Sequence, residues 1–189
     1  MCGALQTKLP TTRHYVVNED GHLANVFVYI KKGLENRRFA APTNAALLDQ
    51  VKCFFEPYML GAQTGQTVQF RNSDAVLHNI HVTSRVNREF NIAQPLKGTV
   101  TTKTFDKPEV FLRVKCDVHP WMFAYIGVVA HPYFAVTDKD GSFRFPFQLP
   151  PGTYTIAANH LKAGELTQEI TVREGELKTV NFLLGLPAR

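Results

Sequence analysis

The chain has 189 residues, 44% of them hydrophobic and 20% charged, which is the balance of an ordinary soluble globular protein of one or two domains. The formal net charge is +5, but Lys and Arg are scattered rather than gathered in a dense basic tract, which argues against nucleic-acid binding. No apolar run approaches the ~20 residues that span a bilayer, so we expect no transmembrane segment.

The three cysteines Cys2, Cys53 and Cys116 are an odd number, so the chain is not a disulfide framework. Cys53, in VKCFFEP, is most simply a buried small apolar residue, and the sequence does not decide whether it bonds to Cys2. The opening MCGALQTKLP lacks the apolar core of a secretory signal, so an exported protein would be in its mature form here. Cys2 is then either an ordinary terminal residue or a lipid-modified cysteine exposed by removal of a leader.

The first two thirds of the chain favour β structure. The stretches LANVFVYIKK (23–32) and GQTVQFRN (65–72) alternate in the manner of strands, and the second puts Val68 and Phe70 on one face. NAALLDQ (44–50) predicts one short helical piece with Asn44 as its cap. The strand pattern continues in HNIHV (78–82), VFLRVKC (110–116) and YIGVV (125–129).

From about residue 131 turns recur at the spacing of a β-sandwich. DKDGSF (138–143) carries the Asp-Gly hairpin signal, LPPGTYTI (149–156) puts a turn before a strand, and VREGEL (172–177) precedes the strand-like TVNFLL (179–184). We therefore predict an all-β chain with a flexible N-terminal segment at 1–14, a domain at 15–130 and a smaller β-module at 131–189.

The stretch GSFRFPFQLPPGTYTIAANH (141–160) resembles the transthyretin-like, carboxypeptidase-regulatory type of small β-sandwich. The resemblance implies a non-catalytic module. Because this stretch is short for a complete module, we expect strands from residues 15 to 31 to complete it.

The stretch KCDVHPWM (115–122) places Cys116, His119 and Met122 at intervals of three between two strand-like runs. A loop can turn three side chains toward one point, whereas side chains along a strand alternate faces. His78 opens HNIH at another strand end. Each residue alone is commoner in cores and turns than at metals, but together they form the donor set of a blue-copper site, two His and one Cys with a weak axial Met. Zinc fits less well, because Met is a poor zinc ligand.

The segments TVQFRNSDAVLHNIHV (67–82) and VKCDVHPWMFAYIGVV (114–129) resemble a cupredoxin, and most of all the amicyanin type, over residues 55–130. The resemblance implies a Greek-key β-sandwich that binds one copper ion, cycling between Cu(I) and Cu(II). Carried over by position, the equatorial ligands are His78, Cys116 and His119, and the axial ligand is Met122.

Three further residues near the ligands have expected roles. By the same resemblance, Asn79 matches the amide that ties the two ligand loops together. Pro120 stiffens the loop and, lacking an N–H, removes one donor near the sulfur, which should raise the reduction potential. Pro120 and Trp121 are also candidates for the surface that contacts a redox partner. Leu77 departs from the family pattern, which commonly has Pro at that position.

The sequence thus predicts a type 1 copper protein that shuttles single electrons between redox partners and is not an enzyme. The partner would be a c-type cytochrome or a dehydrogenase, and the basic balance suits an acidic one. The alternatives are a copper storage or delivery protein, disfavoured by only three Met, and a structural β-protein with a vestigial site. We expect a periplasmic or other extracytoplasmic location. A lipid anchor at Cys2 would attach the protein to a membrane there.

Overall fold

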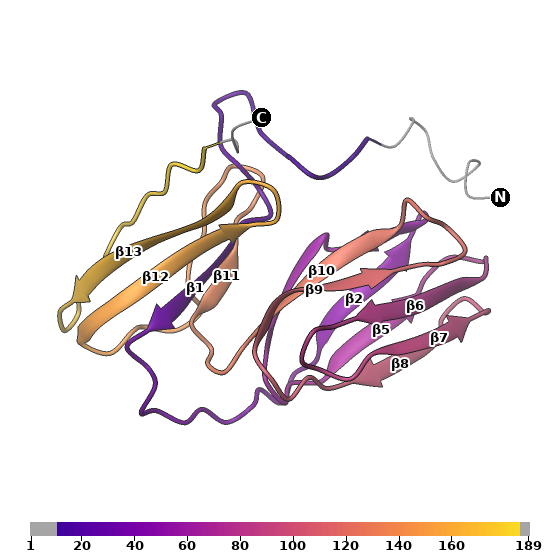
Figure 1. Cartoon of the computed structure of the whole chain (residues 1–189), viewed down its shortest axis with the longest axis horizontal. Coiled ribbons are helices and arrows are strands. Elements are labelled where there is room, and N and C mark those ends of the chain that lie inside the picture. The colour runs from indigo at the N-terminus through magenta and orange to yellow at the C-terminus, as the bar shows by residue number, and fades with distance from the viewer. Residues whose placement is uncertain (1–10, 186–189) are drawn as a thin grey trace. The chain divides into compact units, whose positions relative to one another are not determined.

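The computed structural model describes residues 11–185, and within that range the chain forms strands, turns and irregular segments but no helix (Figure 1). The predicted all-β class is confirmed. None of the described residues lies in a helix long and apolar enough to cross a membrane. Cys2 lies outside the described residues, and so does most of the segment 1–14 that we predicted to be flexible.

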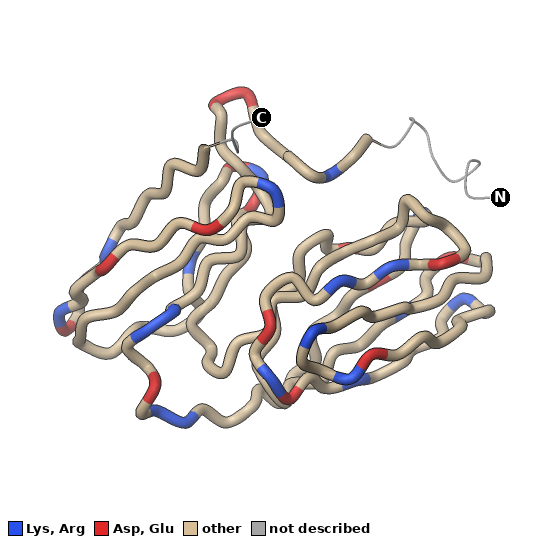
Figure 2. Tube along the Cα trace, viewed as in Figure 1, with Lys and Arg blue, Asp and Glu red and all other residues tan. Residues whose placement is uncertain are grey.

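The described chain divides into two compact units. Unit 1 contains residues 11–12 and 40–130, and unit 2 contains residues 13–39 and 131–185. The main part of unit 1 therefore starts at residue 40, and residues 15–31, which we expected to complete the second module, lie in unit 2. Lys and Arg are interspersed with Asp and Glu along the described trace of both units (Figure 2).

Unit 1 consists of two sheets packed face to face. One has the strand order β4-β10-β9-β6-β7 and the other β3-β2-β5-β8. The strands are β2 (Ala46–Val51), β3 (Phe54–Glu56), β4 (Met59–Gln63), β5 (Val68–Asn72), β6 (His78–Thr83), β7 (Phe90–Gln94), β8 (Val100–Lys103), β9 (Glu109–Lys115) and β10 (Phe123–Val129). Both sheets are mixed, because β10 runs parallel to β4 and β2 parallel to β5.

Alternate residues of these strands build the core between the two sheets. Phe70 of β5, Ile80 of β6 and Leu112 of β9 are fully buried in one continuous cluster. Each such side chain stabilises the fold by about 1.5–3 kcal/mol through burial. Cys116 and Met122 belong to the same cluster, so the core that stabilises the sandwich also fixes the loop between β9 and β10.

The helix predicted at 44–50 is wrong, because these residues form β2. Leu48 and Gln50 are buried while Leu47 and Asp49 are less so, the two-residue period of a strand. β2 pairs in parallel with β5 from Ala46 to Gln50. The sheet contacts outweigh a helix propensity that is only a weak preference in so short a segment.

Unit 2 contains one four-stranded sheet, in the order β11-β1-β12-β13. Its strands are β1 (Phe27–Lys32), β11 (Phe134–Val136), β12 (Gly152–His160) and β13 (Gly164–Val172). β1 pairs with β11 on one side and β12 on the other. This pairing is why residues 13–39 lie with residues 131–185.

Irregular segments supply the apolar side chains that pack against this sheet. They include Phe143 and Phe145 after β11 and Val180, Phe182 and Leu184 after β13. Residues 179–184, predicted to be a strand, form none. Their alternating apolar side chains still pack on the core of the sheet.

Two buried histidines of unit 2 are held neutral. Nε2 of His131 donates to the Ile30 carbonyl at 2.8 Å, while Nδ1 accepts the Tyr133 N–H at 3.2 Å. Nδ1 of His160 accepts the backbone N–H of Ala163 at 3.1 Å. A ring nitrogen that accepts carries no proton, and burial lowers the pKa of both histidines.

We expect unit 2 to lose stability as the pH falls below about 6.5, the pKa of an unfolded histidine. The unfolded chain takes up protons there while the folded rings stay neutral, so each histidine lowers the free energy of unfolding by up to about 1.4 kcal/mol per pH unit. Urea unfolding followed by circular dichroism at pH 7.5 and 5 checks this. His160→Asn, which keeps an acceptor in place of Nδ1 but does not titrate, should flatten the dependence; equal slopes would contradict it.

Candidate metal centre

The pairing of two strands brings the predicted donors to one end of a sheet. β6 and β9 are antiparallel neighbours, with His81 opposite Lys115. The start of β6, at His78, therefore lies beside the end of β9, which Cys116 follows. The donors distant in sequence meet because of this register.

The loop from Cys116 to Met122 folds back on itself. The Cys116 N–H donates to the Met122 carbonyl at 3.0 Å, and the Met122 N–H donates to the His119 carbonyl at 2.9 Å. These bonds close the loop into a tight turn that directs the side chains of Cys116 and His119 toward His78.

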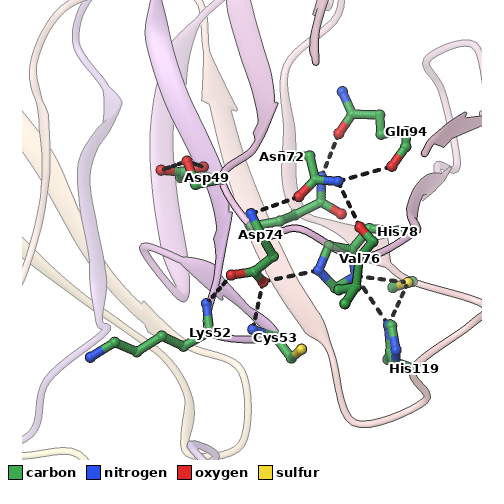
Figure 3. A network of polar contacts seen from close by, with 12 residues as sticks. Asp49, Lys52, Cys53, Asn72, Asp74, Val76, His78, Gln94 and His119 are labelled. Atoms are coloured by element: carbon green, nitrogen blue, oxygen red, sulfur yellow. Dashed lines mark hydrogen bonds and ion pairs between the residues drawn. The ribbon is translucent and has the colours of Figure 1, made fainter. Parts of the chain in front are cut away.

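Three of the four predicted ligands converge. Nδ1 of His78 lies 3.0 Å from Nδ1 of His119. The Cys116 Sγ lies 4.0 Å from Nδ1 of His78 and 3.7 Å from Nδ1 of His119. Figure 3 shows the two imidazoles facing each other. Nitrogen and thiolate ligands bond a metal ion at about 2.0–2.3 Å, so donors this close can share one ion.

Met122 is also beside this cluster in the chain, and its side chain is fully buried. Its backbone is bonded to both Cys116 and His119. The role of its sulfur as axial ligand stays a prediction.

The surroundings favour an ionised sulfur. Burial raises the pKa of the Cys116 thiol, but the neighbouring His78 imidazole and hydrogen bonds from backbone amides, that of Asn79 first among them, outweigh burial and lower the pKa overall. For His78 burial lowers the pKa, and the neighbouring Cys116 sulfur and Asp74 carboxylate raise it more. The thiolate is the form that binds soft metals.

A second group of potential ligand atoms shares His78. It consists of Cys53, Asp74 and His78. Cys53 is disulfide-bonded, so its sulfur is not a thiolate. The cluster of His78, Cys116 and His119 therefore has the better chemistry for a metal.

Asn79 connects the two ligand segments. Its Oδ1 accepts the Asp117 N–H at 2.6 Å, its Nδ2 donates to Asn91 at 2.6 Å, and its backbone N–H points to the Cys116 sulfur at 3.5 Å. This is the tie between the two loops that the sequence resemblance implied for this position.

Asp117 is a residue whose role the sequence did not reveal. Its carboxylate pairs with Lys115 at 2.9 Å and with His81 at 2.8 Å, and it accepts from Asn91 at 2.8 Å. Lys115 above all, with these other partners, holds the pKa of Asp117 well below its usual range. His81, the second histidine of HNIH, turns to Asp117. The only sign of this role in the sequence was that an acidic residue directly follows Cys116.

Asp74 is a second such residue. Its Oδ2 lies 3.0 Å from Nε2 of His78, the ring nitrogen that faces away from the cluster. Its position four residues before His78 was the only sequence signal.

Apolar side chains surround the exposed edge of the loop. Trp121 is 46% exposed and its ring centre lies 5.2 Å from that of His119. Its Nε1 donates to the Cys53 carbonyl at 3.2 Å. Leu77 and Val118 are exposed to a similar degree, and Pro120, between His119 and Trp121, is exposed as well.

No family model matches the chain, and no curated protein does. Among solved structures, the copper-containing nitrite reductase of Thermus scotoductus SA-01 matches with 23% identity and a TM-score of 0.43, over 51% of this chain and 25% of its own. This chain thus spans about a quarter of the reductase. An oxidized Pro-to-Gly mutant of amicyanin matches with 24% identity and a TM-score of 0.41, over 53% of this chain and 97% of its own.

A purple cupredoxin of Nitrosopumilus maritimus matches with 26% identity and a TM-score of 0.37, over 44% of this chain and 97% of its own. At these TM-scores the likeness alone carries no functional conclusion, so the case for a metal depends on the donors themselves. None of these three matches covers more than 53% of this chain. The transthyretin-like resemblance of residues 131–189 stays a prediction.

Proposed function

We propose that unit 1 binds one copper ion at His78, Cys116 and His119, with Met122 as the axial ligand, and carries single electrons between redox partners. The observation that supports this most is the convergence of two Nδ1 atoms and one sulfur within 4.8 Å of one another. Copper supplies one-electron chemistry between Cu(I) and Cu(II) when it is bound to such a set. We place the protein among electron carriers and not among enzymes.

The residues around the cluster suit this role because they hold the donors still. Cys116 and Met122 are fixed by the core and by the closed loop, and Asn79 ties that loop to β6. Donors that are held in one arrangement rearrange little when the charge of the metal changes. Little rearrangement favours fast electron transfer in both directions.

The edge of the cluster offers a surface for a partner. His119 lies beside exposed Trp121, Val118 and Pro120, so an apolar face surrounds the outermost ligand. We propose that an acidic redox protein, a c-type cytochrome or a dehydrogenase, contacts this face, since the net charge of +5 suits such a partner. The disulfide at Cys53 supports an extracytoplasmic location, because disulfides persist in oxidising compartments.

Titration of the metal-free protein with Cu(II) tests the proposal. We expect one equivalent to produce an intense visible band and a type 1 signal in electron paramagnetic resonance. The band should bleach with ascorbate and return with ferricyanide.

A colourless titration would contradict the proposal. Ready loss of copper to a chelator without reversible cycling would instead favour storage or delivery, and a folded protein that binds no copper would favour a structural role.

A further inference from the structure

We propose that Asp74, held by the turn at Lys52 and Cys53, is a positioning residue that orients His78 for the metal and favours the more positive metal ion. This inference rests on the proposed copper site. It assigns a role to Lys52 and Cys53, which lie outside residues 55–130, the range over which the sequence resembles a cupredoxin.

The carboxylate of Asp74 is almost fully buried, and both of its oxygens have hydrogen-bonding partners. Oδ1 accepts the Lys52 N–H at 2.7 Å, and Oδ2 accepts the Cys53 N–H at 2.8 Å and faces Nε2 of His78 at 3.0 Å. Only 6% of the side chain is exposed. Because an ionised carboxylate only accepts hydrogen bonds, the His78 proton lies on Nε2 and leaves Nδ1 free for a metal.

The turn that holds the carboxylate has an uncommon backbone. Lys52 and Cys53 have φ values of 54° and 58°, and they connect Val51 of β2 to Phe54 of β3. A two-residue hairpin with positive φ at both positions normally uses Asn-Gly, since other residues are strained there. Here the strained conformation points two successive N–H groups at one carboxylate, as in an anion-binding nest.

The turn also meets the second ligand loop. The Cys53 carbonyl accepts the indole N–H of Trp121 at 3.2 Å. The turn thus contacts one ligand segment through Asp74 and the other through Trp121.

Behind Asp74 the chain is fixed to the sheet. Asn72 Oδ1 accepts the Asp74 N–H at 2.9 Å, and Asn72 Nδ2 donates to the carbonyls of Val76 and Gln94 at 3.0 and 2.9 Å (Figure 3). These bonds span the segment between β5 and β6. Asp74 therefore has little freedom to move away from His78.

A carboxylate on the far nitrogen of a metal-bound imidazole fixes the tautomer and the ring orientation and raises the basicity of the ligand. Its negative charge also stabilises Cu(II) more than Cu(I). We therefore expect Asp74 to hold the reduction potential below the value that the same ligands would give without it.

Asp74→Asn tests the inference. The neutral amide cannot accept from all three donors, because one of its two polar atoms is itself a donor. We expect Cu(II) affinity to fall about 10- to 100-fold, as for other residues that hydrogen-bond metal ligands. The reduction potential should rise, and a tenfold loss that affects Cu(II) alone corresponds to about 59 mV.

Asp49→Asn is the matched control. The carboxylate of Asp49 is also mostly buried in unit 1, but it bonds Arg71 and Ser73 and not a ligand. The copper affinity and the reduction potential of Asp49→Asn should match those of the unchanged chain. An Asp74→Asn potential and affinity equal to those of this control would overturn the inference.

A readout without copper separates this inference from the proposed function. In the metal-free protein, ¹⁵N-resolved NMR of the imidazoles should show the His78 proton on Nε2, and Asp74→Asn should change the resonance of that proton. If the unchanged chain binds no copper in a coloured site, the proposed function fails, while the NMR still decides the Asp74 contact. An unchanged His78 resonance in the variant would refute the contact.

Asp74→Glu covers the case in which Asp74→Asn does not fold. It keeps the charge on a longer side chain that cannot occupy the same position between Lys52, Cys53 and His78. We expect weaker copper binding with a smaller change in potential. Unchanged affinity in Asp74→Glu would overturn the positioning role.

Discussion

Replacing Cys116 by Ser is expected to abolish the intense visible absorption of the copper-loaded protein completely. That absorption arises from charge transfer out of the Cys116 sulfur, and a hydroxyl oxygen is a harder donor that does not ionise near neutral pH. The substitution is nearly isosteric at a fully buried position, so the sandwich should persist. The visible spectrum after addition of one equivalent of Cu(II) checks the expectation, and circular dichroism checks the fold.

Val118→Ser is the control for this experiment. It introduces the same side chain into the same loop, but at an exposed position two residues away. Its spectrum should keep the band at full intensity. A band that survives in Cys116→Ser would show that the sulfur of Cys116 is not the donor. A band that disappears in both variants would show that its loss is not specific to the sulfur.

The ligand cluster could be predicted from the sequence because three of its four proposed ligands lie close together in the chain. Cys116, His119 and Met122 lie in one short loop, and a tight loop between two strands leaves few arrangements for three side chains. His78 is distant in sequence, and its part in the cluster depended on the family pattern of HNIH. The structure brings it to the loop through the register of β6 on β9.

The contacts behind the cluster could not be anticipated in this way. The turn at Lys52 and Cys53 lacks the Asn-Gly signal of such hairpins, so no sequence pattern indicated that two N–H groups would point at Asp74. The helix prediction over the preceding residues hid the hairpin as well, because it removed one of its two strands.

The division into units was predicted in part. The shortness of residues 141–160 indicated that strands from residues 15 to 31 complete the second module, and β1 does pair with β12, joining Phe27 to Asn159. A strand pattern shows that a segment has a buried face, but it does not show which distant strand will pair with it. The sequence domain boundaries of 15–130 and 131–189 therefore did not separate the two segments that make up unit 2.

Asn79→Ala is expected to destabilise unit 1 by about 2 kcal/mol and to separate the two ligand segments. The substitution leaves the Asp117 N–H without its 2.6 Å acceptor and removes the donor to Asn91 and to the Asp117 carboxylate. Neither the core nor any proposed ligand is altered. The loss should therefore appear as lower stability together with weaker copper binding.

Trp121 provides the probe for this measurement, since it is the only tryptophan and lies in the ligand loop. Its fluorescence during urea unfolding reports on unit 1 separately from unit 2, which matters because a chain of two units need not unfold in one step. Asn91→Ala is the control, because it removes the contacts of Asn91 to the Asn79 side chain and to the Asp117 carboxylate but keeps the bond of Asn79 to the Asp117 backbone. If Asn79→Ala lost no more stability and no more copper affinity than Asn91→Ala, the bond between Asn79 and Asp117 would not be what holds the loops together.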